Sequence, residues 1–429
     1  MTRNTFKEAL FAGFALFAML FGGGNSIFPP YIGMMAGQDW FITFFAYFIA
    51  DICLAILALL ALLTSRTIDR FDGLFTHLGP VASLVFMGTL IFCVCSVASP
   101  RTCTISYEIA VMPVLGDTIP LWAYSAAYFV TVWIFCIRES KVIDYIGRLL
   151  TPVLVLALLA MIVAGVLSPL GPTDTPAKEA NLWYTGLMSG YQTLDCLAIL
   201  LFSFIVARNL TNQGFVTFEC KFRAVAISSL VVMSLSFVIY GGMCYVGATS
   251  SSLMNAQVGH GELLRYVFLN ILGKSGSAVI GTAVGLACLT TGIALTGALA
   301  TFVAKLTNGK FGYNTAVTAL SIGFAVVANV GLENILAIAV PIILILFPAS
   351  LAMILLSLFD AHIANPNVYR VAVACAIATG LCEVLLGFGF EPARIVTMLP
   401  LQEHGFGWLV PALLGAGVGH FVPGVKRAI

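Results

Sequence analysis

The stretch FGGGNSIFPP, Phe21 to Pro30, lies inside a hydrophobic run that begins near Phe6. Its three glycines, its asparagine and its two prolines predict a break in a helix that would otherwise cross a membrane. Backbone outside a regular helix persists at membrane depth only where protein or a water-filled cavity satisfies its polar groups. We therefore interpret this stretch as part of a binding site.

The composition around this stretch is that of an integral membrane protein. Of the 429 residues, 60% are hydrophobic and 9% are charged, and the mean hydropathy is +1.03. Soluble domains carry about 25% charged residues, so a surface that faces water cannot be built from this chain. The apolar runs have the length of helices, not of outer-membrane strands. We expect an all-α polytopic protein embedded in a lipid bilayer.

Charge, cysteine and histidine usage exclude several other classes of site. Basic and acidic residues number 20 and 19, so the net charge of +1 indicates no nucleic-acid partner. The 11 cysteines form no CxxC pair and lie almost wholly in apolar runs, and the five histidines lie in loops or at span ends. We expect no cofactor, no metal other than a coupling sodium ion, and no obligate protein partner. Arg3 and Lys7 precede the first run without a small-residue cleavage site, which favours a retained first span.

Twelve stretches have the length and hydropathy of a membrane span. They are residues 8–29, 40–63, 80–110, 121–137, 148–168, 183–207, 224–248, 275–304, 314–331, 333–357, 368–387 and 403–423. Lysines and arginines of the connecting segments alternate in density, which predicts that both termini are cytoplasmic. The predicted inner segments hold Arg3, Lys7, Arg66, Arg70, Arg138, Lys141, Arg148, Arg208, Lys221, Arg223, Lys305, Lys310, Arg370, Lys426 and Arg427. The predicted outer segments hold only Lys178, Arg265, Lys274 and Arg394.

A second break is predicted in the sixth span, LMSGYQTLDCLAILL, Leu187 to Leu201. Gly190 alone is equally well explained as a site of close helix packing. Breaks at similar depth in two corresponding spans instead indicate the binding site of a secondary transporter. Exposed amides at helix N-termini attract anionic groups there, and carbonyls at the opposing ends coordinate cations.

The two breaks also predict an internal repeat. Five spans precede the second broken span, and five spans starting with it form a second unit that begins on the opposite side of the membrane. We expect a 5+5 inverted repeat with halves at 1–168 and 169–358 and two appended helices at 359–429. Broken helices 1 and 6 belong to the substrate site.

Ionisable residues inside spans are functional candidates by default. Asp195 follows the second break, where it either caps the restarting helix or acts in gating. Arg101 either pairs with an acid such as Asp195, Asp51 or Glu108, or meets a substrate carboxylate. A structural, ion-paired or snorkelling arginine is at least as well supported.

The eighth span carries paired hydroxyls in LACLTTGIAL, Leu286 to Leu295. Thr290 and Thr291 lie one turn after Ala287 and offer the oxygen ligands that a hard cation prefers. Threonines in membrane helices more often bond back to their own helix, which the sequence by itself favours here. The GxxxG at Gly281–Gly285 is typical of helix packing.

Six motifs together resemble the bacterial branched-chain amino acid:cation symporters over essentially the whole chain. These are GGGNSIFPP at 22–30, SPRT at 99–102, IGRLLTP at 146–152, GYQTLDCLA at 190–198, LACLTT at 286–291 and NVGLENI with the later P and FP at 329–348. The resemblance implies a LeuT-like inverted-repeat fold and symport of leucine, isoleucine and valine with sodium or protons across the bacterial inner membrane.

The resemblance also assigns residues to sites. It places the substrate's amino and carboxylate groups at Phe21, Gly22, Gly23, Gly24 and Asn25 and at Gly190, Tyr191, Gln192 and Thr193. It places a sodium ion at Ala18, Phe21, Ala287, Thr290 and Thr291. The resemblance therefore favours the two threonines as sodium ligands over hydroxyls that only bond back to their own helix. Arg101, Asp195 and Asp51 are the candidates for gating or proton coupling.

Two motifs depart from the family pattern, and other functions compete. CSVASPRT replaces the usual third-span motif and YQTLDC the usual sixth-span motif, so a carrier for another apolar amino acid such as methionine is the alternative. An ion channel requires a continuous pore with rings of ligands. An intramembrane enzyme requires a catalytic pair at one depth, for which only Asp51 and Asp195 qualify. We expect no enzymatic activity and no catalytic residue, and a sensor built on a transporter fold is a further alternative.

Overall fold

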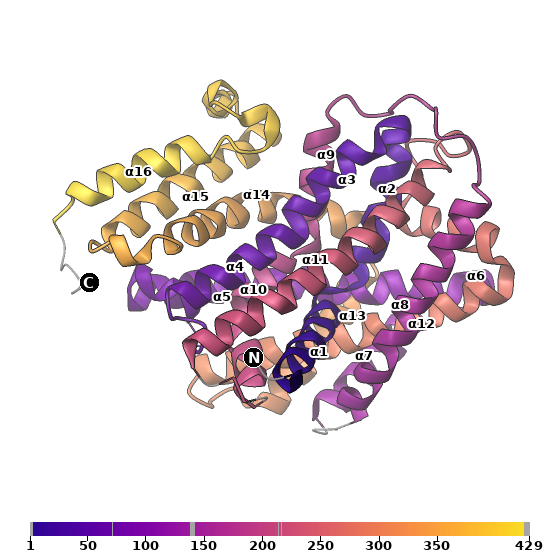
Figure 1. Cartoon of the computed structure of the whole chain (residues 1–429), viewed down its shortest axis with the longest axis horizontal. Coiled ribbons are helices and arrows are strands. Elements are labelled where there is room, and N and C mark those ends of the chain that lie inside the picture. Colours follow the sequence, from indigo (N-terminus) through magenta and orange to yellow (C-terminus); the bar gives the residue numbers. More distant parts are fainter. Residues whose placement is uncertain (1–2, 71, 138–141, 213, 216, 424–429) are drawn as a thin grey trace.

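The computed structural model describes residues 3–70, 72–137, 142–212, 214–215 and 217–423 (Figure 1). Every regular element among them is helical, as the sequence predicts. The α-helices are α1 (Arg3–Leu20), α2 (Gly23–Ala36), α3 (Trp40–Phe48), α4 (Leu54–Thr64), α5 (Pro80–Ser106), α6 (Met112–Leu115), α7 (Leu121–Ile137), α8 (Val142–Leu167), α9 (Leu182–Thr193), α10 (Asp195–Asn212), α11 (Phe218–Ala248), α12 (His260–Leu306), α13 (Tyr313–Ala328), α14 (Leu332–Ser357), α15 (Asn367–Gly387) and α16 (Leu409–Phe421). Single π-helical turns at Ile49–Cys53 and Tyr107–Val111 join α3 to α4 and α5 to α6.

The described helices have the dimensions of membrane spans. Six helical stretches are long and apolar enough to cross a bilayer, namely Gly23–Thr64, Pro80–Leu115, Phe218–Ala248, His260–Leu306, Leu332–Ser357 and Asn367–Gly387. Shorter apolar helices lie at Glu8–Leu20, Leu121–Ile137, Pro152–Leu167, Tyr313–Ala328 and Leu409–Phe421. Large apolar side chains such as Phe11, Trp122 and Leu156 are two-thirds exposed, as suits a surface that faces lipid.

The first break is shorter than the sequence predicts. Only Phe21 and Gly22 separate α1 from α2, and Gly22 is extended, with φ −110° and ψ −174°. Pro29 and Pro30 lie inside α2 instead of ending it. Neighbouring helices allow proline within membrane helices. Here α11 approaches so closely that a Cβ on Gly247 would lie 2.0 Å from the Pro30 carbonyl oxygen.

The second break lies at Leu194, inside the stretch that the sequence predicts and between Thr193 and Asp195. Residues 189–193 complete α9, whereas Leu194 has φ 71° and ψ 9°, a left-handed conformation that ends the helix. Gly190 is a packing residue, because a Cβ there would lie 2.6 Å from the Ala50 Cβ. A Cβ on Gly186 would lie 2.2 Å from the Thr43 carbonyl oxygen. These two glycines hold α9 against α3 and the π turn that follows it, so the helix persists through them.

Segments predicted to share one side of the membrane contact one another. On what we call the near face, the segment 65–79 reaches the starts of α11 and α15. The Lys221 ammonium lies 2.8 Å from Asp69, and the Arg370 Nε donates to the Leu78 carbonyl at 3.1 Å. Of the predicted inner basic residues, Arg138, Lys141, Lys426 and Arg427 and the side chains of Arg3, Lys7, Arg148 and Arg208 lie outside the described residues.

The far face carries the segments 37–39, 168–181, 249–260, 331–333 and 402–404. The Gln38 amide donates to the Thr175 carbonyl at 2.9 Å, and the Asn181 side chain donates to the Glu403 carbonyl at 2.7 Å. Lys178 donates to the Ser251 carbonyl at 2.6 Å, and burial lowers the pKa of this lysine. These contacts join connecting segments on each face, whereas the side of the membrane on which each face lies stays a prediction.

Helix packing arranges the remaining elements around the two breaks. α5 and the π turn Tyr107–Val111 lie against α12, where a Cβ on Gly281 would lie 2.3 Å from the Ile109 carbonyl oxygen, as the GxxxG pattern predicts. α3 lies against α9, and α11 lies against α1 and α2. The last two helices, α15 and α16, lie beside α14 at one edge of the molecule (Figure 1).

Candidate functional site

Asn25 joins the two breaks. Its side-chain nitrogen donates to Asp51 Oδ2 at 3.1 Å and to Asp195 Oδ2 at 2.8 Å. Its side-chain oxygen accepts the Gly22 backbone N–H at 3.1 Å. A side-chain amide has two N–H donors and one carbonyl acceptor, so each polar group of this buried residue has a partner. The start of α2 is thereby tied to both in-span acids.

Asp51 occupies a π-helical turn that directs it at the end of α9. The Thr193 hydroxyl lies 2.8 Å from Asp51 Oδ1 and 2.7 Å from the Gly190 carbonyl oxygen. Asp51 has no exposed surface and Asp195 is 7% exposed. Single π turns inside α-helices recur at functional sites, and this one brings a carboxylate of the second predicted span to the break in the sixth.

Arg101 bonds to the second break through backbone carbonyls. Its Nη1 donates to the Gln192 carbonyl and its Nη2 donates to the Thr193 carbonyl at 3.1 Å. These carbonyls belong to the last turn of α9 and have no partner within that helix. Asp195 adds a favourable electrostatic interaction with the guanidinium. Arg101 is 3% exposed, so the snorkelling interpretation is wrong.

Arg101 also lies against the first turn of α2. A Cβ on Gly24 would lie 3.2 Å from its Nη2, and its guanidinium carbon lies 6.0 Å from the centre of the Phe28 ring. No acceptor among the described residues lies within hydrogen-bond distance of the buried Arg101 Nε. The arginine therefore places a positive charge between the N-terminus of α2 and the C-terminus of α9.

The charges at the centre of this site do not balance. One guanidinium and two carboxylates, from Arg101, Asp51 and Asp195, are all less than 10% exposed. Burying an unpaired charge is costly, and two carboxylates that share one amide donor repel each other. With all three groups ionised, the cluster carries one net negative charge and favours one additional cation.

The predicted cation ligands of α12 lie beside the first break. Thr290 and Thr291 both donate to the Ala287 carbonyl, at 2.9 and 3.0 Å, which is the back-bonding arrangement. A Cβ on Gly23 would lie 3.0 Å from the Cys288 Sγ. The start of α2 and this turn of α12 are therefore neighbours.

Tyr128 of α7 fixes the same turn, and sequence reasoning missed it. Its buried hydroxyl lies 2.8 Å from the Cys288 carbonyl oxygen and 3.0 Å from the Thr102 hydroxyl. It thus connects α7, α12 and the residue after Arg101. A tyrosine inside an apolar span was the available signal, because its hydroxyl needs a partner when buried.

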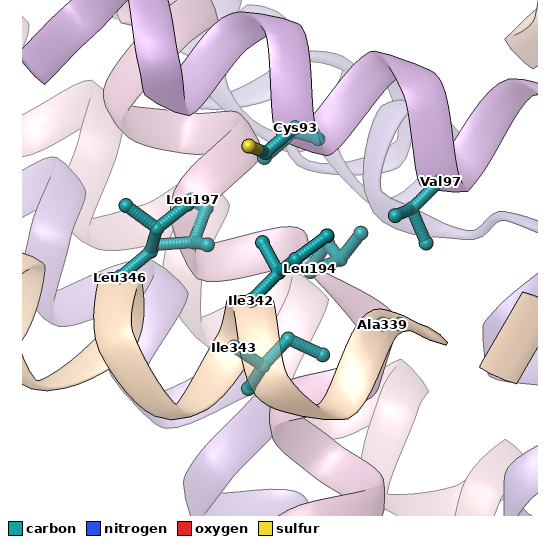
Figure 2. A pocket seen from close by; sticks show the side chains of 9 residues that line it. Cys93, Val97, Leu194, Leu197, Ala339, Ile342, Ile343 and Leu346 are labelled. Atoms are coloured by element: carbon teal, nitrogen blue, oxygen red, sulfur yellow. The ribbon is translucent and has the colours of Figure 1, made fainter. Parts of the chain in front are cut away.

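A small apolar cavity adjoins the second break (Figure 2). It has a volume of about 10 Å³ and is lined by α5, α14 and the break itself, with Val97, Leu194 and Ile343 on three sides. Figure 2 shows these aliphatic side chains pointing toward one another. A void of this size and polarity stays dry, so Leu194 lies beside free space and not against a fully packed wall.

The other predicted site residues surround this centre. Ala18 lies in the last turn of α1, and the Phe21 amide donates to the Phe17 carbonyl at 2.7 Å. The Tyr191 ring stacks on Phe347 of α14, with ring centres 4.3 Å apart. Asp195 opens α10, where its charge meets the positive end of the helix dipole, although its side-chain bond goes to Asn25.

The chain is similar to known transport proteins over nearly its whole length. The sequence profile of the family described as branched-chain amino acid transport protein matches residues 5–426. The branched-chain amino acid permease BraB of Bacillus subtilis is 31% identical, over 96% of this chain and 95% of that protein. The branched-chain amino acid transport system 2 carrier protein of Pseudomonas aeruginosa is also 31% identical, over the same shares.

Solved structures establish the fold. The inward-facing conformation of Mhp1 has a TM-score of 0.64 and 12% identity, covering 96% of this chain and 90% of that chain. The crystal structure of MhsT in complex with L-phenylalanine has a TM-score of 0.55 and 16% identity, covering 96% of this chain and 97% of that chain. The chain is thus an all-helical membrane protein with the LeuT-like fold of these transporters. The match over nearly the full length of both sequence relatives shows that the chain is a secondary transporter and belongs to the branched-chain amino acid transport protein family.

Proposed function

We propose that the chain carries leucine, isoleucine and valine into the cell together with one cation, by alternating access across the bacterial cytoplasmic membrane. The observation that carries this proposal is the buried cluster of one guanidinium and two carboxyl groups, from Arg101, Asp51 and Asp195, which becomes neutral by binding one more cation, a proton or a metal ion. A zwitterionic amino acid adds no net charge, so the substrate alone leaves the imbalance in place. A cation that enters with the substrate removes it. The names of the relatives support the substrate class.

The substrate's charged ends have complementary partners at the two breaks. Its carboxylate is expected at the first turn of α2, where the Gly23 and Gly24 amides have no partner within the helix and where the helix dipole and Arg101 favour an anion. Its ammonium group is expected at the Asp51 carboxylate, beside the end of α9. The substrate then bridges the two broken helices along with Asn25.

Two sites compete for the coupling cation. Sodium suits the oxygens of Ala18, Phe21, Ala287, Thr290 and Thr291, where both threonine hydroxyls turn from the Ala287 carbonyl toward the ion. A proton suits the carboxyl pair of Asp51 and Asp195, because one shared proton relieves their repulsion. By linkage, either cation and the substrate raise each other's affinity by the same factor.

The membrane arrangement is part of the proposal. We place both termini and the near face in the cytoplasm and count twelve spans, with inverted halves at 1–168 and 169–358 and appended helices at 359–429. The contacts among loops on each face support this arrangement, as does the charge asymmetry of those loops.

The test is uptake of labelled leucine into proteoliposomes under a sodium gradient and, separately, a pH gradient. Accumulation driven by sodium, and lost in the double variant Thr290→Ala and Thr291→Ala, supports the α12 site. Accumulation driven by pH, with Asp195→Asn exchanging leucine but no longer concentrating it, supports the carboxyl pair. Failure of excess isoleucine and valine to compete, or failure to accumulate leucine under both gradients, contradicts the proposal.

A further inference from the structure

The start of α12 on the far face holds a histidine between two other elements, α2 and α14. The His260 ring stacks on Tyr31 of α2 with ring centres 3.7 Å apart, and meets Phe28 edge-on at 5.5 Å. Its Nδ1 lies 3.0 and 3.1 Å from the two carboxylate oxygens of Glu333, the second residue of α14. The His260 backbone N–H donates to the same carboxylate at 2.7 Å.

Two glycines flank this histidine, and each is approached by a carboxylate. A Cβ on Gly259 would lie 3.2 Å from Glu333 Oε1, and a Cβ on Gly261 would lie 2.0 Å from Glu108 Oε2. Glu108 belongs to the second π-helical turn, Tyr107–Val111. The segment Gly259-His260-Gly261 is therefore held between α14 and the π turn after α5, and a Cβ at position 261 requires the Glu108 side chain to move.

These contacts connect the far face to the buried site. Phe28, which meets His260, is fully buried and lies 6.0 Å from the Arg101 guanidinium carbon. Tyr31 and Phe28 are one turn apart on α2, the helix whose first turn is expected to hold the substrate carboxylate. If substrate enters from the far face between α2 and α12, Tyr31 has to move away from the His260 ring.

We propose that Gly259-His260-Gly261 is a proton-sensitive latch that holds α2 closed on the far face, and that protonation of His260 strengthens it. This inference rests on the proposed function, because it assumes that substrate enters between α2 and α12. A neutral imidazole already donates to Glu333 and stacks on Tyr31. An imidazolium makes a charge-assisted bond to Glu333 and a cation–π contact with Tyr31.

Most of the charged groups around the latch are acidic. Glu333 of α14, Glu108 of the π turn and Glu262 of α12 itself are acidic, and Glu179 of the 168–181 segment interacts electrostatically with Tyr31. Arg265, one turn along α12, is the opposing positive charge, and it also interacts with Glu108. Acidification from pH 8 to pH 5.5 covers the range in which histidine ordinarily titrates.

Labelling of the native Cys288 thiol measures how often the protein opens toward the far face. Cys288 is fully buried beside Gly23, so a charged maleimide reaches it only when α2 moves away. The reagent is added to intact cells, or to inverted vesicles if the far face lies inside, and labelled peptides are identified by mass spectrometry. Labelling is compared between the wild-type chain and His260→Gln at each pH, which cancels the intrinsic pH dependence of the thiol.

We expect labelling of the wild type relative to His260→Gln to fall about fivefold between pH 8 and pH 5.5, the effect of adding charge to one hydrogen bond. Glu333→Gln should weaken this response, and Gly261→Ala should raise labelling at both pH values by displacing Glu108. His404→Gln, at an exposed histidine on the same face, should match the wild type. A ratio that does not change with pH overturns the latch. Leucine uptake is measured in a separate assay. An absence of uptake would contradict the proposed function and would leave the labelling result unchanged.

Discussion

Leu194 has an unusual combination of strain and burial for a break in a helix. Its φ of 71° is a region that favours glycine, yet its side chain is 4% exposed beside the cavity of Figure 2. A glycine would form this break without strain. Leucine instead supplies packing between α5 and α14, and the backbone strain is the cost.

This combination predicts an inverted order of stability for two substitutions. Both Leu194→Ala and Leu194→Gly remove packing and should destabilise by about 2–5 kcal/mol. Leu194→Gly should nevertheless be more stable than Leu194→Ala by about 1 kcal/mol, because only alanine retains the left-handed strain. Inside a helix the order is the opposite. Thermal unfolding in detergent measures the stabilities of the two variants. If Leu194→Ala were the more stable of the two, as alanine is inside a helix, Leu194 would not be strained.

Asn25 gives a second prediction at this scale. Asn25→Asp replaces the amide that bonds both acids with a third carboxylate, so repulsion should separate α2 from Asp51 and Asp195. We expect leucine uptake to fall at least about tenfold, the effect of roughly 1.4 kcal/mol, while membrane insertion is retained. Asn334→Asp, at an exposed asparagine of α14, is the matched control. Equal uptake by the two variants would mean that Asn25 does not organise the site.

Among the helices, α9 depends on close packing for its position. Gly186 and Gly190 lie one turn apart and face α3 and its π turn. Because α9 ends at Thr193, its approach to α3 sets the distance between the Thr193 hydroxyl and Asp51. The packing of one helix thus places the donor that the acid requires.

Added side chains on this helix face should therefore disturb both stability and transport. Gly186→Ala and Gly190→Ala should each cost roughly 1–3 kcal/mol, because backbone atoms of α3 cannot yield as a side chain can. Gly323→Ala in α13 is the control, since nothing lies within 4 Å of its Cβ position. Detergent thermal unfolding and leucine uptake measure the effects. Unchanged behaviour of all three variants would contradict the tight packing.

For the whole molecule, the orientation in the membrane has a native reporter. Cys220 is the exposed cysteine at the start of α11 on the near face. A membrane-impermeant thiol reagent added to intact cells should leave Cys220 unlabelled and label it after permeabilisation. Asp174→Cys on the far face, in a Cys220→Ser background, should label in intact cells. The reverse pattern would place the near face outside and invert the proposed topology.

Much of the architecture could be predicted from local sequence. Apolar runs indicated the membrane helices, since a span is a property of about twenty consecutive residues. The glycine-rich stretch located the first break, and Asp51, Asp195 and Arg101 were identified because ionisable residues inside spans are rare. The GxxxG at 281–285 correctly predicted close packing against a neighbouring helix.

The sequence by itself determined the class of protein, the existence of two breaks and the residue types at them, because hydropathy and backbone preference act locally. Only the tertiary structure decided that Arg101 bonds to carbonyls of α9, that Asn25 bridges two acids, and that the second break falls at Leu194. Asn25 and Asp195 are 170 positions apart. A bond between them depends on how helices pack, and the same packing of α9 on α3 carries the helix through Gly190 to end at Leu194.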